Sequence, residues 1–167
     1  LLISSAIEIE FSLFKKKTNL PHRLVIAGSD GPYSDEVHKA AFESSAASDI
    51  FITGYFPHES FPELYRNSEA CVFPSVNEGA GLPILEAMAT GIPVACAKAG
   101  ALPEVAGNNA LFFDSDNIEE FASCIEKITT DESFRKKISA SALAWSKRFS
   151  WEKCVLETLE IIKSVLK

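Results

Sequence analysis

Residues 70–96 read ACVFPSVNEGAGLPILEAMATGIPVAC, and this stretch decides the fold. Its apolar opening, residues 70–74, predicts a strand that is covered on both faces, because such strands lose the alternation of polar and apolar residues. Residues 82–90 have the pattern of a helix, and the Gly-Ile-Pro that follows is typical of a helix end. A second apolar run, 94–96, predicts the next strand. The stretch therefore indicates a strand–helix–strand unit.

The same alternation continues on both sides of this unit. Apolar runs at 23–27 and 49–54 predict two earlier strands, and residues 111–113 predict a later one. Strands and helices that alternate at this spacing favour right-handed crossovers. We therefore expect an α/β, Rossmann-like fold, with an open parallel sheet flanked by helices on both faces. The expected helices before and between the early strands span residues 1–17, 33–47 and 58–68, the last with Pro62 in its first turn.

The final third of the chain is predicted to be wholly helical. Asn117, Asp131 and Ser150 each precede an apolar-periodic run, at the N-cap position of a helix. We expect no ligand chemistry there, because open parallel sheets bind ligands beyond the carboxyl ends of their strands. The loops of interest follow Ala27, Ile52, Phe73 and Ala95.

Length and composition limit the possible classes of protein. A chain of 167 residues with 47% hydrophobic content suits one domain, so residues 1–167 are expected to form a single unit. The net charge of -7 disfavours a nucleic-acid partner. The four cysteines are interpreted as reduced core thiols, and no cysteine or histidine has metal-ligand spacing. With neither a signal peptide nor an apolar run of about 20 residues, a cytoplasmic location is expected.

The loop after residues 70–74 carries two carboxylates, Glu78 and Glu86. Glu78 comes at the mouth of the strand, where the glycines at 79 and 81 let the backbone turn and bring amides close to a ligand. The following helix N-terminus favours a phosphate or another anion. Glu86 lies one turn into that helix and leans toward its start, so its oxygens suit the vicinal hydroxyls of a ribose.

These residues resemble the signature of family 4 (group 1) retaining glycosyltransferases. The specific match is Glu78-x7-Glu86 inside E-G-A-G-L-P-x-L-E-A-M-A-x-G-x-P-V. Ala80 departs from the pattern, because a Phe is common between the two glycines. The resemblance covers nearly the whole chain, from about Leu1 to Lys167. Further family-like segments are Phe51–Tyr55, Leu64-Tyr65, Val72–Ser75, Leu102–Val105 with Gly107, and Phe149–Glu152.

The resemblance implies the C-terminal, donor-binding lobe of a two-lobed GT-B enzyme. Glu78 would be the catalytic carboxylate that binds hydroxyls of the donor sugar, and Glu86 would hold the ribose. The backbone near Tyr55 and Phe56 would frame the base, and Gly28 would line the donor cleft. The donor sugar and diphosphate would be held by the backbone of Gly79, Ala80, Gly81 and Leu82.

The family's activity is transfer of a hexose from a nucleotide-diphosphate sugar to a saccharide or lipid-linked acceptor, with retention and without a metal ion or other cofactor. The family's diphosphate-binding Arg and Lys, and its N-terminal acceptor lobe, would precede Leu1. Because the chain opens on Leu1-Leu2-Ile3 without a methionine, it is interpreted as a fragment. Without those charges and that lobe, the isolated chain is expected to bind the donor weakly and to transfer nothing. Membrane association, as a peripheral contact through the missing lobe at the inner face, stays open.

The alternative is a degenerate GT-B lobe that serves as a binding or assembly module. The presence of both Glu78 and Glu86 favours the enzyme. A dinucleotide-binding oxidoreductase is disfavoured, because Gly28 and Gly31 lack the G-x-G-x-x-G spacing. Lys98 is expected to be an exposed loop lysine. The sequence leaves the base, the sugar, the acceptor, the linkage and the oligomeric state open.

Overall fold

The computed structural model describes residues 7–166, with side chains from Phe11 onward. The helix predicted at 1–17 is present as α1 (Ile7–Thr18), and the part of this prediction that covers residues 1–6 lies outside the described residues. Asn19 ends α1 with a positive φ of 51° and donates its amide proton to the carbonyl of Lys15. Asn is one of the few residues that tolerate this left-handed conformation, so it serves as a helix terminator.

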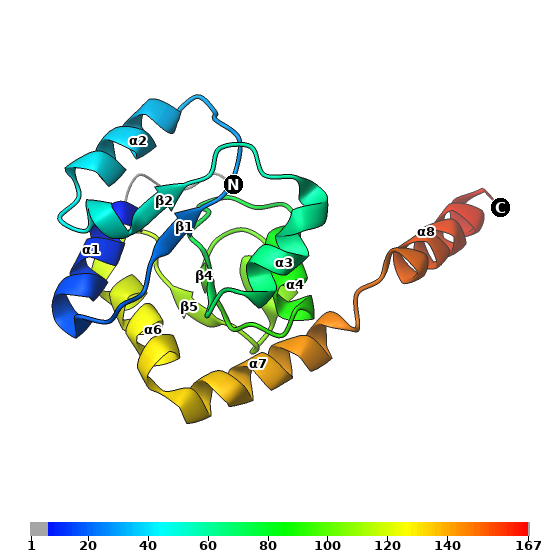
Figure 1. Cartoon of the computed structure of the whole chain (residues 1–167). Coiled ribbons are helices and arrows are strands. Elements are labelled where there is room, and N and C mark those ends of the chain that lie inside the picture. Colours follow the sequence, from blue (N-terminus) through cyan, green and yellow to red (C-terminus); the bar gives the residue numbers. More distant parts are fainter. Residues whose placement is uncertain (1–6, 167) are drawn as a thin grey trace.

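Parallel strands form the centre of the molecule (Figure 1). β1 (Leu24–Ile26) pairs with β2 (Ile50–Ile52), and a second sheet has the order β3-β4-β5. Its strands are β3 (Cys71–Phe73), β4 (Val94–Ala97) and β5 (Leu111–Phe113). All of these strands lie where the sequence predicted them, which confirms the parallel α/β architecture.

The hydrogen-bonded pairs form two sheets, whereas the sequence pattern predicted one. A cavity of about 450 Å³ lies between them, lined by every residue of both β1 and β3. Aromatic side chains from other elements, including Phe14 of α1 and Tyr65, line the same cavity. The edges of β1 and β3 therefore face this largely apolar space, and within residues 7–166 they form no ladder with each other.

The helices form two groups that flank the strands (Figure 1). α1 packs on α2 and α6, whereas α4 packs on α3, α5 and α7. Each group thus contributes an apolar face to the core. The bounds are α2 (Ser34–Glu43), α3 (Phe61–Arg66), α4 (Leu82–Ala89), α5 (Leu102–Ala106), α6 (Ile118–Thr130), α7 (Glu132–Ser146) and α8 (Trp151–Val165).

Two helix predictions need correction. The helix predicted at 33–47 ends at Glu43, because Ser44 adopts an extended conformation and its hydroxyl accepts a hydrogen bond from the amide of Ala46 at 3.1 Å. This side-chain bond offers the backbone an alternative to the helix. The helix predicted at 58–68 is a 3-10 turn, His58–Ser60, followed by α3 with Pro62 in its first turn.

The three predicted N-caps are confirmed. The side chains of Asn117, Asp131 and Ser150 accept hydrogen bonds from the amides three residues further on, at 3.1, 2.9 and 3.1 Å. Each bond satisfies one of the amides that the first helical turn leaves free. α6, α7 and α8 therefore begin where the sequence predicts.

The core lies between the β3-β4-β5 sheet and the helices α4 and α6. All four residues of β4 are buried, as expected for a strand covered on both faces. Phe113 of β5 and Phe121 of α6 meet edge to face, with ring centroids 5.0 Å apart. The largest fully buried side chains in this core are Phe14, Phe73, Phe113, Phe121, Ile84, Met88, Leu102 and Ile128.

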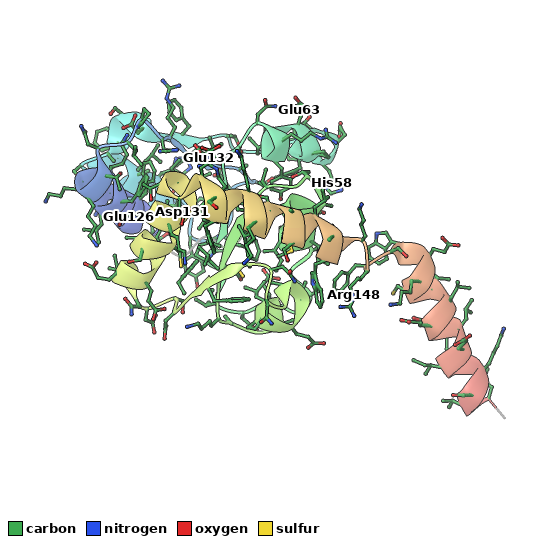
Figure 2. The ribbon with its side chains drawn as sticks, turned by 90° about the horizontal axis from the view of Figure 1, so that it is seen from below. His58, Glu63, Glu126, Asp131, Glu132 and Arg148 are labelled. Atoms are coloured by element: carbon green, nitrogen blue, oxygen red, sulfur yellow. The ribbon has the colours of Figure 1, made fainter. Side chains whose placement is uncertain are left out.

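α8 projects away from this body, beyond Arg148 at the end of α7 (Figures 1 and 2). Every residue from 151 to 166 is exposed, including large apolar side chains such as Trp151 and Leu156. Among residues 7–166, no helix combines the length and the apolar character that crossing a membrane requires.

Candidate functional site

The predicted site begins in the loop that joins β3 to α4. Ser75 follows the strand and is buried, and its hydroxyl donates a hydrogen bond to the carbonyl of Asn77 at 3.3 Å. This bond folds the loop on itself directly before Glu78. Glu78 is half-buried, whereas Gly79 and Ala80 are exposed. The loop thus offers a carboxylate and two accessible peptide groups side by side.

Gly81 turns the chain from this loop into α4. Its φ of 60° and ψ of 37° are left-handed, a conformation that glycine adopts without the cost a side chain would bring. A Cβ at Gly81 would also lie 2.6 Å from Cδ2 of Leu102, so the buried Leu102 side chain would have to shift to make room for one. The helix then begins at Leu82 with Pro83 in its first turn, as predicted.

The back of the loop rests on the turn between β4 and α5. The amide of Ala101 donates a hydrogen bond to the carbonyl oxygen of Glu78 at 3.0 Å. Gly100 has a positive φ of 51°, and a Cβ there would lie 2.5 Å from that oxygen and 2.8 Å from the Glu78 nitrogen. This contact was not among the sequence-based predictions. The only signal for it is a glycine shortly before Leu102, in the loop after β4.

α5, which covers the family-like segment Leu102–Val105, is anchored on α7. The indole Nε1 of Trp145 donates a hydrogen bond to the carbonyl of Val105 at 2.7 Å. Gly107 brings the backbone against the same indole ring, where a Cβ would lie 3.0 Å from Cζ2. The Arg148 guanidinium covers the ring at 4.2 Å from its centroid, and Figure 2 shows Arg148 just after α7, in the link to α8. The support of the site thus extends to the helical third of the chain.

Glu86 lies in the middle of α4 and is half-buried. Burial raises the pKa of the Tyr65 hydroxyl, and the negative charges of Cys71 and Glu86 add to this effect. Burial also raises the pKa of the Cys71 thiol to about 12, with a further contribution from Glu86. Glu86 belongs to the helix that packs on both α3 and β3.

Neither carboxylate is neutralised by a side chain in the described part of the chain. Among the side chains that the structure describes, Glu78 and Glu86 take part in no ion pair and no side-chain hydrogen bond. An ionised carboxylate has two oxygens, and each of them accepts hydrogen bonds. Both groups can therefore accept hydrogen bonds from hydroxyl groups of a ligand.

The other predicted residues lie on the β1–β2 sheet. The amide of Gly28 donates a hydrogen bond to the carbonyl of Gly54 at 3.2 Å, which joins the two loops after these strands. Tyr55 follows and is 76% exposed, whereas Phe56 packs edge to face on Phe61 of α3 with ring centroids 5.2 Å apart. The backbone at Tyr55 is thus beside the end of β1.

The structure groups the predicted residues into two clusters, one on each sheet. Glu78 through Glu86 lie on the β3–α4 unit, and Gly28 lies with Tyr55 and Phe56 on the other sheet. The cavity between the two sheets borders both clusters, because it is lined by Ala27, which follows β1, and by Pro83 of α4.

Two features of the surroundings bear on the predictions. Lys98 is exposed and lies 3.9 Å from a carboxylate oxygen of Glu120, which confirms it as a surface lysine. All four cysteines are free thiols, but the predicted core position is wrong for Cys154, which is exposed because α8 projects away from the core. Within the described part of the chain, no group of three or more His, Cys, Asp or Glu residues is placed to hold a metal ion.

Comparison with known proteins supports the assignment of the family. Residues 9–145 match the family model described as glycosyl transferases group 1. The chain is 35% identical over 153 residues to the Escherichia coli O-antigen chain mannosyltransferase B, covering 92% of this chain and 40% of that protein. The chain therefore spans well under two thirds of the length of that relative.

Solved structures show the same fold. The Anabaena protein Alr3699/HepE, in complex with UDP and glucose, superposes with a TM-score of 0.81 at 23% identity, covering 95% of this chain and 44% of that one. The C-terminal domain of a group 1 glycosyl transferase (LpcC) from Francisella tularensis gives a TM-score of 0.76 at 23% identity, covering 86% and 77%. The fold is that of the C-terminal domain of GT-B glycosyltransferases. Since the family model matches most of its length, the chain belongs to the glycosyl transferases group 1 family.

Proposed function

We propose that this chain is the donor-binding domain of a family 4, retaining glycosyltransferase that transfers a hexose from a nucleotide-diphosphate sugar to a saccharide or lipid-linked acceptor. The observation that carries the proposal is the pair of half-buried carboxylates of Glu78 and Glu86 on one strand–loop–helix unit, for which the described side chains provide no ion pair and no hydrogen bond. A purely structural domain has no need to keep two such acceptors unpaired.

Each group in the site has a role that its chemistry supports. The Glu78 carboxylate accepts hydrogen bonds from hydroxyls of the donor sugar and is the catalytic residue. The backbone of residues 79–82 and the N-terminus of α4 bind the sugar and the diphosphate, because helix N-termini favour negative charge. Glu86 binds the ribose hydroxyls. Gly28 and the backbone at Tyr55 and Phe56 frame the base.

The reaction replaces one bond at the anomeric carbon of the donor. The acceptor hydroxyl attacks from the face that the nucleotide leaves, so the configuration is retained. The bond to the diphosphate oxygen breaks, and the diphosphate takes the proton from the acceptor. The amides that bind the diphosphate act where negative charge develops, which is the most effective place for electrostatic stabilisation. The proposed reaction requires no metal ion, so a chelator such as EDTA should leave it unchanged.

The proposed sugar is a hexose, with mannose as the first candidate. The E. coli relative is named as an O-antigen chain mannosyltransferase, which supports both this sugar and a role in polysaccharide synthesis. The HepE structure holds UDP and glucose, which makes glucose and uridine the second candidates. The free cysteines are in keeping with a reducing, cytoplasmic compartment.

Transfer requires more than these residues. We propose that an N-terminal lobe of the full protein binds the acceptor and supplies the basic residues that neutralise the diphosphate. By this proposal the 167-residue chain alone binds the donor weakly and transfers nothing. Detectable transfer by the chain alone would contradict this part of the proposal.

Isothermal titration with GDP, UDP and ADP and their mannose and glucose derivatives tests the function. One nucleotide family should bind, and Glu86→Ala should abolish this binding. The matched control is Glu63→Ala, which removes an exposed helical carboxylate on α3 that Figure 2 shows at the surface. Equal binding by both variants would remove Glu86 from the site. The function is refuted if no nucleotide binds to the unmodified chain and none binds to a longer protein that includes the N-terminal lobe.

A further inference from the structure

The position of Glu78 depends on backbone contacts made from behind its loop. The Glu78 carbonyl accepts the hydrogen bond from Ala101, and the α-carbon of Gly100 packs directly against the Glu78 peptide groups. Further along the loop, the Leu102 side chain is fully buried and fills the space beside Gly81. Three consecutive residues after β4 thus touch both ends of the Glu78–Gly81 loop.

Among the described residues, no side-chain contact holds the Glu78 carboxylate in place of these backbone contacts. The Glu78 carboxylate has no partner among the described side chains, and the two residues that follow it are exposed. The carboxylate is therefore directed by the peptide groups to which it is attached. A shift of the Glu78 backbone by a fraction of an ångström would move the carboxylate with it, and productive sites tolerate only about 0.5 Å.

The supporting turn is itself held rigidly. β4 enters it fully buried, and α5 leaves it with Val105 bonded to Trp145 of α7. The turn therefore cannot move aside without disturbing the core at one end and the α5–α7 contact at the other. A side chain at Gly100 would have to displace the Glu78 loop, because the atoms in its way are backbone.

We propose that Gly100 is a positioning residue for Glu78. Its missing side chain allows the β4–α5 turn to press against the Glu78 backbone and fix the carboxylate toward the donor sugar. The inference rests on the proposed function only in the role that Glu78 has there. The contact itself is independent of that role.

Gly91 provides the matched comparison. It has a positive φ of 83°, so an alanine there suffers backbone strain of the same kind as at Gly100. A Cβ at Gly91 meets only the Leu143 side chain, at 3.8 Å, which is ordinary contact. Gly91 follows α4 at the end opposite to Glu78. Both Gly100→Ala and Gly91→Ala should lower stability, and only Gly100→Ala should displace the site.

The test compares how much the sugar adds to nucleotide binding. For the unmodified chain, the ratio of affinities for GDP-mannose over GDP, or UDP-glucose over UDP, measures the contact with the sugar. Glu78→Ala should remove this increment, the gain in affinity that the sugar contributes, so that the nucleotide sugar and the free nucleotide bind equally. Gly100→Ala should reduce it tenfold or more, which corresponds to about 1.4 kcal/mol, and leave the affinity for the free nucleotide within about twofold. Gly91→Ala should change neither.

If Gly100 had only a structural role, Gly100→Ala would lower stability without changing the ratio of the two affinities. Loss of stability reduces the amount of folded protein, whereas the ratio is a property of the folded protein. Equal ratios in Gly100→Ala and Gly91→Ala would overturn the inference. If the sugar increment is absent from the unmodified chain, the role proposed for Glu78 fails instead. The contact is then judged by the coupling experiment described next, which needs no ligand.

A measurement on the labelled, unmodified chain keeps the inference testable even if Gly100→Ala does not fold. The scalar coupling through the hydrogen bond between the Ala101 amide and the Glu78 carbonyl should be observable, in line with the 3.0 Å distance. Its absence would overturn the inference. Gly100→Asn is the second variant, because Asn tolerates a positive φ and still carries the Cβ.

Discussion

Gly81→Ala adds only one methyl group and should nevertheless lower the stability of this chain strongly. The left-handed conformation of Gly81, with φ of 60°, costs a side-chain-bearing residue about 1–2 kcal/mol. The new Cβ would also lie 2.6 Å from Cδ2 of Leu102, which is fully buried and cannot move into solvent. Such overpacking costs about 1–3 kcal/mol, so the free energy of unfolding should fall by about 2–5 kcal/mol in total.

Urea denaturation followed by far-UV circular dichroism measures this change. Gly31→Ala is the control, because a Cβ at Gly31 meets nothing within 4 Å. The free energy of unfolding of this variant should stay within about 0.5 kcal/mol of that of the unmodified chain. The double variant Gly81→Ala/Leu102→Ala removes the overlap. It should be more stable than the sum of the single changes predicts, by about 1–3 kcal/mol. Additive losses, or a benign Gly81→Ala, would refute the packing described at this turn.

Further predictions concern the anchor of α5, the thiols and the nucleotide site. Trp145→Phe removes the hydrogen bond to the Val105 carbonyl, so the free energy of unfolding should fall by about 1–2 kcal/mol in the same urea assay. An unchanged urea midpoint would contradict the role of this hydrogen bond in holding α5. At pH 8 a thiol reagent should modify the exposed Cys154 rapidly and Cys71 only on unfolding. The raised pKa of about 12 keeps the Cys71 thiol protonated until the pH approaches that value. Rapid modification of Cys71 in the folded chain would contradict its burial. Glu86→Ala should lose nucleotide binding while its melting temperature stays within about 2 °C, because the carboxylate has no partner to lose among the side chains that the structure describes.

Local patterns predicted most of the secondary structure. The N-caps at Asn117, Asp131 and Ser150 were visible because each side chain bonds an amide only three residues away. The strands were visible because burial on both faces leaves uninterrupted apolar runs. α2 was predicted too long because Ser44 can cap its own backbone as easily as it can continue a helix.

Contacts between distant segments were not predictable in this way. Gly100 supports the Glu78 loop through a backbone contact between two loops, and nothing in the spacing of either loop encodes it. The cavity between β1 and β3 likewise depends on how α1 and α3 place their aromatic side chains. For the candidate site, the sequence identified the loop and the two carboxylates, whereas the structure added the elements that hold Glu78 in place.

A titration of the isotopically labelled chain with the tightest-binding nucleotide sugar, followed by amide chemical shifts, tests the central claim most directly. The account predicts selective shifts in the loop from Glu78 to Leu82, at Glu86, and at Gly28 and Tyr55 on the other sheet. These shifts should be absent when Glu86→Ala is titrated in parallel. Shifts confined to other surfaces, or a chain whose spectrum does not respond to any nucleotide sugar at millimolar concentration, would contradict the claim that this domain binds a glycosyl donor.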